Sequence, residues 1–328
     1  MSTNTTTLYA TARGHAAVGE RLLDCARRSR PLRRALEHHF AARGKEVRAQ
    51  LALLASESLD LPEVVSVPWA AACELLHNAS LLHDDLIDLD RHRRGIETVW
   101  SKFGADQAIL SGDHLLNEAF GLVATLPLPP ESHVSAMIAA HAAVSRTIRG
   151  ASEEGVRLER PNFSVAHYER MVAEKTGSLL ALPVEGALLM AGRSEKESSA
   201  ARQALTAYGS AYQIEDDLAY VLGQKEGREP GSGLRRGLVD APVAHYWRQA
   251  SPAERVELSD YFARRERDAE DVEAWRRRIA ASRAIDLCRQ HVHTLCVRAR
   301  TSLAILPEPI RAGIRDLLGN SLLGRVTQ

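Results

Sequence analysis

The segment from Cys73 to Gly95 changes from apolar to acidic to basic within a few turns of a helix. No glycine or proline interrupts it before its end, and Pro68 precedes it, where the first turn of a helix tolerates proline. The segment therefore predicts a helix that begins near Pro68 and ends in a basic loop. Because the residues before the acids are nearly all apolar, the acidic end of the helix is expected to be buried.

Three aspartates follow the apolar part of this segment. Asp84 and Asp88 are four residues apart and project from one helix face, with Asp85 beside them. Like charges at this spacing repel each other, and a solvated acidic face is the simplest alternative. Buried carboxylates need a cation, and the arginines at 91–94 follow too late to neutralise all three. The pattern favours Mg²⁺, which binds one or two carboxylates and leaves positions for water and substrate phosphate.

Length and composition limit the class of protein. The 328 residues are 45% hydrophobic and 26% charged, which is typical of a folded globular chain. Lys+Arg and Asp+Glu both number 42, so no overall charge favours nucleic acid. The first residues lack the features of a signal peptide, the apolar stretch 178–192 is too short to span a membrane, and the four separated cysteines suggest no disulfide framework. We expect a soluble, cytoplasmic protein.

Helical periodicity runs through most of the chain, and the signals for β-strands are absent. About residues 1–14 are expected to be disordered, and 227–237 is the longest stretch rich in glycine and proline, expected to be a loop. No linker divides the chain, so we predict one all-α domain over residues 1–328. Helices are predicted from periodicity or capping boxes at 131–148, from Ser194–Glu197, from Ser251–Glu254 and at 253–305.

A cluster near the C-terminus, formed by Cys288, His291, His293 and Cys296, contains residue types that bind zinc. At 3.6 residues per turn, His291 and His293 diverge by about 200° around a helix. The four side chains therefore do not share one face, and we interpret them as part of a packed or solvated helix.

Residues 207–220 repeat the pattern of the first acidic segment, because a run of small and apolar residues again ends in paired aspartates, Asp216 and Asp217. Helical bundles build metal sites from carboxylates on facing helices. If the two acidic helices face each other across the mouth of a cavity, the gap between them suits a diphosphate bound to Mg²⁺.

Six pieces of sequence occur in a fixed order: R-G-K-E-V-R at 43–48, E-L-L-H-N-A-S-L-L-H-D-D-L-I-D at 74–88, R-R-G at 93–95, F-G-A-D-Q-A-I-L-S-G-D-H-L-L at 103–116, K-T-G at 175–177 and Y-Q-I-E-D-D at 212–217. Any one of them is weak evidence, whereas the ordered combination is highly specific. It resembles the trans-isoprenyl diphosphate synthases, the polyprenyl synthetase family, over most of the chain.

The resemblance implies an all-α, isoprenoid-synthase-type bundle of mostly antiparallel helices around a deep central cavity, usually in a homodimer. It also implies a prenyltransferase of isoprenoid biosynthesis, in which three Mg²⁺ ions assist the ionisation of an allylic prenyl diphosphate. The double bond of isopentenyl diphosphate then attacks the allylic cation, and a proton leaves. No protein nucleophile is required, but water must be excluded because it would quench the cation.

The resemblance also carries roles onto single positions. Direct metal ligands match Asp84, Asp88 and Asp216, which Asp85 and Asp217 support, and Lys175 joins these aspartates as a catalytic position. The pocket for isopentenyl diphosphate matches Lys45, Arg48, His77 and Arg94. The site for the allylic diphosphate matches Arg93, Lys175, Thr176 and Gln213. Taken alone, any such lysine or arginine is more often a surface charge.

The chain departs from the family pattern mainly on the side of the leaving diphosphate. Tyr220 stands where the second motif usually has a third aspartate, and Glu46 replaces a common basic residue. The glutamine usual near 149–154 is missing. Ser232 and Leu238 replace two lysines that would contact diphosphate, and arginine is not an equivalent point charge. The arginines that could compensate are Arg228, Arg235 and Arg236.

Product length is predicted from the helix before Asp84. Ser80 lies one turn earlier on the same face with Ala79 beside it, and both side chains are too small to stop a growing prenyl tail. One further helical turn adds about 5.4 Å, or roughly one isoprene unit, so Leu75 and Leu76 are candidates for the next floor. We predict a product of C20 or longer.

Other classes of function stay open. The changed loop after the second acidic motif suits a diverged class I terpene cyclase, or a prenyltransferase to an acceptor other than isopentenyl diphosphate. Cyclases guide cations with aromatic faces, and the aromatic content of 5% argues mildly against cyclisation. A regulatory subunit of a heteromeric synthase is a third possibility, against which the retention of Asp84, Asp88 and Asp216 argues.

Overall fold

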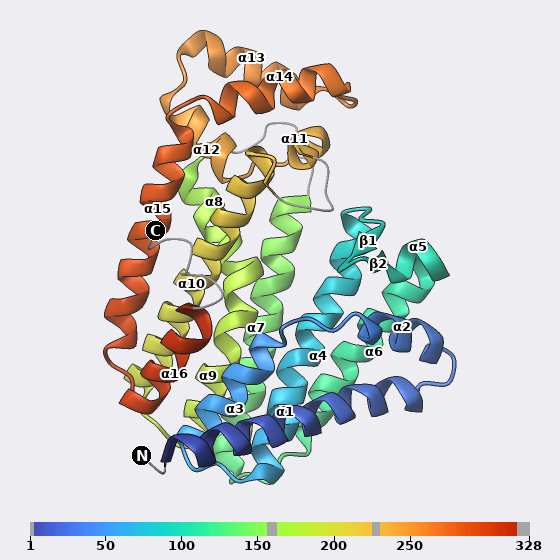
Figure 1. Cartoon of the computed structure of the whole chain (residues 1–328), viewed down its shortest axis with the longest axis vertical. Coiled ribbons are helices and arrows are strands. Elements are labelled where there is room, and N and C mark those ends of the chain that lie inside the picture. The colour runs from blue at the N-terminus through green and yellow to red at the C-terminus, as the bar shows by residue number, and fades with distance from the viewer. Residues whose placement is uncertain (1–2, 156–162, 225–229, 320–328) are drawn as a thin grey trace. The chain divides into compact units, whose positions relative to one another are not determined.

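The computed structural model describes residues 3–155, 163–224 and 230–319 (Figure 1). Within these ranges the chain forms sixteen α-helices, one π-helix and two short β-strands, so the prediction of an all-α fold is confirmed. The contacts between residues divide the chain into two compact units. Unit 1 comprises 1–144, 179–202 and 302–328, and unit 2 comprises 145–178 and 203–301. The single domain stays a prediction.

Unit 1 contains the first helices, the two strands and the last helix. Its elements are α1 (Thr3–Arg28), α2 (Arg33–Ala41), α3 (Val47–Ser58), α4 (Glu63–Ile87), β1 (His92–Arg93), β2 (Ile96–Glu97), α5 (Val99–Phe103), α6 (Ala105–Ala124), the first part of α7 (Pro130–Gly155), nearly all of α9 (Ser178–Met190), the start of α10 (Glu195–Val221) and α16 (Glu308–Leu318). The first of these, α1, begins inside the range that was expected to be disordered.

Unit 2 contains the end of α7, most of α10 and the helices of the C-terminal third. Its other elements are α8 (Val165–Val172), the π-helix η1 (Ala173–Gly177), α11 (Ser232–Arg236), α12 (Ala241–Gln249), α13 (Pro252–Ala263), α14 (Ala269–Ala280) and α15 (Ala284–Leu303). Helices α13 and α14 lie side by side (Figure 1), joined by ion pairs from Arg278 to Glu254 and Glu257.

Helix α4 forms the centre of unit 1. It contacts α1, α3, α5 and α6, and lies side by side with α6 in Figure 1. It begins at Glu63, after the N-cap Pro62, and ends at Ile87. Pro68 therefore lies inside the helix and not in its first turn, and the helix ends well before Gly95. The predicted start near Pro68 was wrong, because extended Pro62 precedes the first turn. The predicted basic segment does follow the helix, and it forms a hairpin.

The indole of Trp69 fixes α4 against α9. The side chain is fully buried, and its Nε1 donates to the carbonyl oxygen of Pro183 at 3.0 Å. Gly186 faces the ring, where an added β-carbon would lie 2.5 Å from Cη2. The absence of a side chain at this position therefore allows α9 to approach the tryptophan, and the close packing holds α4 in place below its acidic end.

A short antiparallel hairpin follows α4, so the prediction that strands are absent was wrong here. His92 pairs with Glu97 and Arg93 with Ile96. The turn between them consists of Arg94 and Gly95, with φ of 51° and 82°. A two-residue turn of type I′ needs positive φ at both positions, which usually indicates Asn-Gly or Asp-Gly. Arginine is uncommon in this conformation, so the hairpin had no recognisable sequence signal.

The predicted helix starts are confirmed. Ser251 and Glu254 form a capping box at the start of α13, and Ser194 and Glu197 exchange the same pair of hydrogen bonds before α10. Helix α7 covers the predicted helix at 131–148. The segment 253–305 is mostly helical but is divided among α13, α14 and α15. The expected loop at 227–237 contains the short helix α11, and its residues 227–229 lie outside the described part of the chain.

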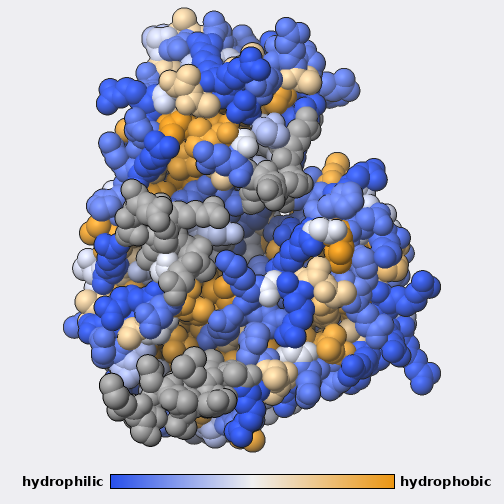
Figure 2. All heavy atoms as spheres, in the orientation of Figure 1, coloured by the Kyte–Doolittle hydropathy of each residue, from blue (hydrophilic) through white to orange (hydrophobic). Residues whose placement is uncertain are grey.

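Hydrophilic residues cover most of the face that Figure 2 shows. Among the described residues, no helix is both long and apolar enough to cross a membrane. Even α9, the most apolar stretch of the sequence, has only thirteen residues, whereas a bilayer needs about twenty.

Candidate functional site

The first acidic cluster lies at the C-terminal end of α4. Asp84 and Asp88 are half-buried, and Asp88 is the C-cap residue, whose backbone N–H donates to the carbonyl oxygen of Asp84 at 2.7 Å. The end of a helix with unsatisfied carbonyl groups carries a partial negative charge, which disfavours carboxylates. Two acids on one face at this end are therefore an arrangement that a bound cation would stabilise.

Asp85 differs from its neighbours, because its carboxylate is buried and paired. Only 2% of the residue is exposed, and Arg93 Nη2 and Nε lie 2.6 and 2.7 Å from Asp85 Oδ1. This ion pair ties the hairpin to the end of α4. The structure thus brings together Asp85 and Arg93, two predicted site residues, in a contact that positions the hairpin.

Two arginines of unit 1, Arg48 and Arg94, act on the ring of His77, and this cluster of basic side chains is named the cationic pocket. Arg48, on the first turn of α3, lies with its Nη1 3.1 Å from Nε2 of His77 on α4. Because arginine only donates, His77 Nε2 accepts, and the proton of the neutral ring is on Nδ1. Burial and the positive charges of Arg48 and Arg94 lower the pKa of His77 well below its ordinary value. His77 is therefore a neutral ring that its hydrogen bond with Arg48 orients.

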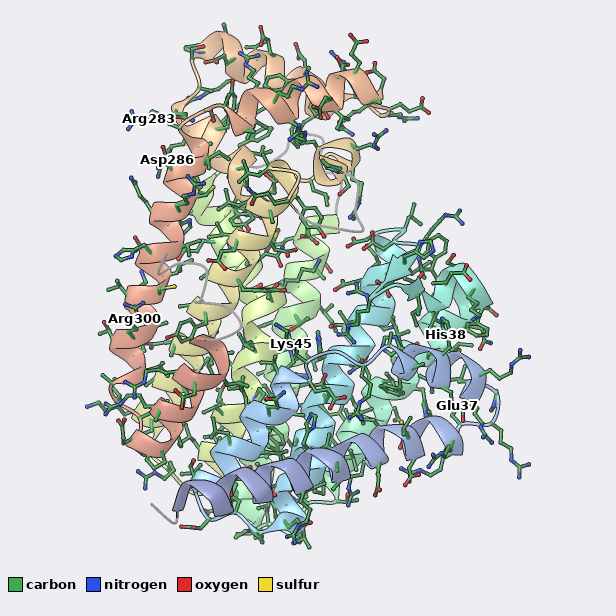
Figure 3. All side chains as sticks on the ribbon, in the orientation of Figure 1. Glu37, His38, Lys45, Arg283, Asp286 and Arg300 are labelled. Atoms are coloured by element: carbon green, nitrogen blue, oxygen red, sulfur yellow. The ribbon has the colours of Figure 1, made fainter. Side chains whose placement is uncertain are left out.

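The segment between α2 and α3 contacts Arg94 of the cationic pocket. Lys45 is exposed on this segment (Figure 3), and Arg94 Nη1 donates to the carbonyl oxygen of Ala42 at 2.9 Å. Gly44 lies against the same guanidinium, where an added β-carbon would be 2.5 Å from Arg94 Cζ. The glycine of the R-G-K motif thus makes room for Arg94, which itself has positive φ. Such strained backbone is concentrated at functional sites.

Glu46, the acidic departure in the first basic motif, does not bring an uncompensated charge into this pocket. Its carboxylate is buried, with 7% of the residue exposed. Arg43 Nε and Nη2 donate to its two oxygens at 2.8 and 3.1 Å, and His15 Nε2 lies 2.8 Å away. The glutamate therefore holds the turn before α3, which explains how the position can be acidic.

The second acidic motif lies on α10, in unit 2. Asp216 is half-buried, whereas Asp217 is buried. Asp217 accepts hydrogen bonds from the Tyr168 hydroxyl on α8, from Gln213 Nε2 at 3.0 Å and from the backbone N–H of Ala241 at 3.1 Å. Burial raises the pKa of Asp217 to about 6 despite these donors. Its carboxylate joins α8, α10 and α12, and these contacts fix the part of α10 that carries Asp216.

Lys175 and Thr176 are presented by the π-helix η1. Such bulges occur frequently at functional sites, because they turn side chains out of the regular helical register. Thr176 Oγ1 donates to Gln213 Oε1 at 3.4 Å, and Lys175 forms an ion pair with Glu154 at the end of α7. The structure therefore joins Thr176, Gln213 and Asp217 in one network of unit 2.

Two glycines allow other helices to approach η1 closely. A β-carbon at Gly150 would lie 2.5 Å from the backbone nitrogen of Lys175, and one at Gly177 would lie 2.9 Å from Cα of Thr206. Both contacts are with backbone atoms, which cannot rotate away. The glycine of the K-T-G motif therefore has a packing role, and the position of Lys175 depends on it.

The remaining predicted positions lie on α4, on α11 or outside the described residues. Ala79 is fully buried, and the hydroxyl of half-buried Ser80 donates to the carbonyl oxygen of His77 at 2.7 Å. Ser232 begins α11, after Gly231 with φ of 77°. Arg228 lies outside the described residues.

No group of three or more His, Cys, Asp or Glu side chains is arranged to hold a metal ion anywhere in the described ranges. In the C-terminal cluster, His291 Nε2 instead lies 3.2 Å from Glu169 Oε2, and Cys288 is buried. The carboxylate oxygens of Asp84 and Asp88 are of the type that a hard cation such as Mg²⁺ prefers, and Mg²⁺ takes only one or two carboxylates and fills its shell with water and phosphate.

Sequence reasoning missed the polar residues that support these positions. They are the buried residues Glu74, Asn78 and Tyr168 and the half-buried residues His39 and Glu154. Glu74 gave one signal, because a charged residue inside an apolar run needs a specific partner. His39, Tyr168 and Glu154 gave none, since their partners are distant in sequence. Asn78 gave none either, because its second partner, His39, is also distant.

Comparisons with known proteins give a consistent result. The family model described as polyprenyl synthetase matches residues 29–279. A geranylgeranyl pyrophosphate synthase from Geoglobus acetivorans is 29% identical over 294 residues, which are 89% of this chain and 90% of that protein. A crystal structure of a decaprenyl diphosphate synthase from Rhodobacter capsulatus has a TM-score of 0.86 at 24% identity, covering 99% of both chains. A polyprenyl synthase from Caulobacter crescentus, complexed with calcium and isoprenyl diphosphate, has a TM-score of 0.83 at 26% identity, covering 95% of this chain and 94% of that one.

Proposed function

The chain belongs to the polyprenyl synthetase family, a family of prenyltransferases, and from this premise we propose that it condenses an allylic prenyl diphosphate with isopentenyl diphosphate. The proposal rests on the cationic pocket, in which Arg48 donates to the neutral ring of His77 and the charge of Arg94 acts on the same ring. An enzyme that ionises a single allylic diphosphate needs one phosphate site at its carboxylates. Arg48, Arg94 and Lys45 form a set of cations additional to Lys175 on η1, and this set supports a second substrate that carries a diphosphate.

We propose three Mg²⁺ ions as the metal cofactor, with Asp84 and Asp88 as protein ligands in unit 1 and Asp216 as a protein ligand in unit 2. The half-burial of all three aspartates supports this assignment, as does the position of the first two at a helix end that disfavours bare carboxylates. The calcium in the Caulobacter crescentus relative is a divalent cation with the same preference for oxygen ligands. When bound, the metal would stabilise the negative charge of the departing diphosphate.

The chain's own residues bind and orient the diphosphates of the two substrates. Arg48, Lys45 and Arg94 would hold the diphosphate of isopentenyl diphosphate, and His77 would donate from Nδ1 or fix Arg48 through Nε2. Lys175 and Thr176 on η1 would contact the allylic diphosphate. Lys175 is paired with Glu154, so the incoming phosphate would have to compete with that carboxylate. Slow ionisation of the allylic diphosphate is therefore expected for two reasons. Glu154 competes for Lys175, and positions 232 and 238 have serine and leucine where the family has lysine.

We propose a product of C20 or longer, because the positions one turn before Asp84 are Ala79 and Ser80. The similar proteins make products as different as geranylgeranyl and decaprenyl diphosphate. Their names therefore do not set the length for this chain.

We also propose that the enzyme is a homodimer. Four large apolar side chains on the unit 1 parts of α6 and α7 are exposed: Ile109, Leu110, Val134 and Ile138. Val134 and Ile138 are one turn apart on the same face of α7. Exposed apolar residues on one helix face, such as Val134 and Ile138, are typical of a surface that another subunit covers.

The test is an assay of the purified chain with Mg²⁺ and farnesyl diphosphate, with and without isopentenyl diphosphate, and with products identified by mass spectrometry. A longer prenyl diphosphate that forms only when both substrates and Mg²⁺ are present is the expected result, and EDTA should abolish it. A hydrocarbon or alcohol from farnesyl diphosphate alone would instead establish a terpene cyclase. Turnover only after another acceptor is added would establish a different prenyltransferase.

A further inference from the structure

Glu74 is a buried carboxylate at the point where three elements of unit 1 meet. It lies on α4, one helical turn before His77 and Asn78, and only 2% of the residue is exposed. Its neighbours along the helix are apolar, so nothing in its local sequence explains a charged side chain. A buried carboxylate is costly unless specific donors satisfy it.

The two oxygens of Glu74 accept from two different elements. Oε2 accepts from the backbone N–H of Ala49 on α3 at 3.2 Å, and Oε1 accepts from Asn78 Nδ2 at 3.3 Å. Asn78 Nδ2 also donates to the carbonyl oxygen of Glu74 at 2.8 Å, which fixes the amide. Asn78 Oδ1 in turn lies 2.9 Å from His39 Nε2 on α2. Since an amide oxygen only accepts, His39 donates, and the network joins α2, α3 and α4.

The contact with Ala49 replaces a missing helix cap. Ala49 is the third residue of α3. The N–H groups of the first turn of a helix have no partner within the helix. The N-cap residue Glu46 has positive φ and forms no side-chain cap in the described part of the chain, because its carboxylate is engaged by Arg43 and His15. Glu74 supplies the acceptor from α4 instead. A carboxylate near a helix N-terminus is also favoured by the helix dipole.

Arg48 lies on the same turn of α3 as this cap. Arg48 immediately precedes Ala49 on the first turn of α3, and its Nη1 donates to Nε2 of His77 on α4. Glu74 and His77 are successive positions on the same face of α4. One helix therefore holds both the backbone of the first turn of α3 and the guanidinium that this turn carries.

We propose that Glu74 is a positioning residue for the isopentenyl diphosphate pocket: by capping α3 across its first turn, it fixes Arg48 against His77 so that the pocket is preformed. The inference rests on the proposed function of that pocket. Glu74 itself does not touch the substrate. Losing the cap leaves α3 free to shift by a fraction of a turn, and the guanidinium at its end moves with it.

The variants are Glu74→Ala, which removes both acceptors, and Glu74→Gln, which keeps the shape and one acceptor but sets a donor against the other donor. The matched control is Glu185→Gln. Glu185 lies on α9 in the same unit, is 4% exposed and is paired with Arg202. Within the part of the chain that the structure describes, it forms no hydrogen bond or ion pair with Arg48, His77 or the 42–46 segment. All three variants lose a buried carboxylate, so thermal unfolding separates a general loss of stability from an effect on the pocket.

Two readouts are measured for each protein: KM for isopentenyl diphosphate and for farnesyl diphosphate in the elongation assay, and calorimetric binding of isopentenyl diphosphate alone. We expect Glu74→Ala to raise both KM and the dissociation constant for isopentenyl diphosphate about tenfold, and Glu74→Gln to raise them by less. KM for farnesyl diphosphate should change less than about twofold. Glu185→Gln should leave both KM values unchanged. Glu74 variants that bind isopentenyl diphosphate as tightly as the wild type would overturn the inference.

Failure of the proposed function gives a different pattern. If the wild type binds isopentenyl diphosphate but does not elongate, the calorimetric comparison still decides the role of Glu74. If the wild type does not bind isopentenyl diphosphate, both the pocket and this inference are overturned. If Glu74→Ala does not fold, Glu74→Gln and its binding constant decide the question.

Discussion

At the scale of single residues, Gly44 gives the most direct test of the cationic pocket. A β-carbon at position 44 would lie 2.5 Å from Cζ of Arg94, whose Nη1 is held by the carbonyl oxygen of Ala42. We therefore expect Gly44→Ala to displace the guanidinium and raise KM for isopentenyl diphosphate by about tenfold, the value of a charge-assisted contact. KM for the allylic substrate should stay unchanged in the same steady-state assay.

Gly121→Ala is the matched control for this substitution. Among the described residues, nothing lies within 4 Å of a β-carbon at this position of α6. The control adds the same methyl group to the same unit and should leave both KM values at wild-type levels. An unchanged KM for isopentenyl diphosphate in Gly44→Ala would show that Arg94 is not part of the pocket.

The half-buried ring of His39 makes stability depend on pH. Burial lowers the pKa of His39 to about 4, from an ordinary value of 6.5. Between these values the unfolded chain binds the proton more tightly, so the stability contributed by the neutral ring is complete above pH 6.5 and is lost as the pH falls toward 4. Relative to His39→Gln, the wild type should lose at most about 2.5 kcal/mol of unfolding free energy between pH 7.5 and 4.5.

Urea unfolding of the metal-free proteins at the two pH values measures this difference. The comparison with His39→Gln cancels the opposite contribution of Asp217, whose raised pKa makes it destabilising as the pH rises from about 4 to about 6. Glutamine keeps an N–H donor for Asn78 Oδ1, so the variant is not expected to lose the hydrogen bond. Equal pH profiles for the two proteins would mean that His39 is protonated in the folded state at its ordinary pKa.

At the scale of elements, the contact between α7 and η1 determines where Lys175 lies. A β-carbon at Gly150 would be 2.5 Å from the backbone nitrogen of Lys175 and 2.7 Å from the carbonyl oxygen of Met171. Backbone atoms cannot rotate away, so the two helices must separate. We expect Gly150→Ala to lower the unfolding free energy by about 1–3 kcal/mol and to raise KM for farnesyl diphosphate more than that for isopentenyl diphosphate.

The measurement combines chemical unfolding with the same steady-state assay, and Gly121→Ala again serves as the control because alanine is favoured over glycine inside a helix. A Gly150→Ala protein that is as stable as the wild type, with unchanged KM for the allylic substrate, would contradict the close approach of α7 to η1.

The elements also show which features the sequence could predict. The helices and the capping boxes at Ser194 and Ser251 follow from local patterns of a few residues, and the structure contains them. The end of α4 could not be placed, because the turn that reverses the chain uses Arg94 at positive φ instead of asparagine. The π-helix has no local signal either, since it depends on glycines at 150 and 177 that admit other helices.

For the candidate site the limit is the same. Arg48, His77 and Arg94 were chosen by their motifs, and they converge in unit 1. Glu74 and Asn78 were not chosen, although they lie in the same motif, because their partners Ala49 and His39 come from other helices. Local sequence indicates the residues that a ligand would touch, whereas the residues that hold them depend on tertiary packing.

At the scale of the whole molecule, the equal numbers of acidic and basic residues bear on assembly. With 42 of each, the chain has no net charge at pH 7 to oppose self-association. Ile138 on α7 is 62% exposed and Val134, one turn earlier, is 58% exposed. A lone monomer would leave both in water, so the proposed homodimer gives them a partner surface.

Light scattering coupled to size exclusion should therefore give the wild type twice the mass of one chain, and Ile138→Asp should shift it toward the monomer by placing a charge in an apolar interface. The matched control is Val256→Asp, because Val256 is 60% exposed on α13, in unit 2, outside the proposed interface. The control should remain dimeric. If Ile138→Asp remains dimeric while both variants fold, the apolar face of α7 is not the interface, and the exposed pair Ile109 and Leu110 on α6 becomes the next surface to substitute.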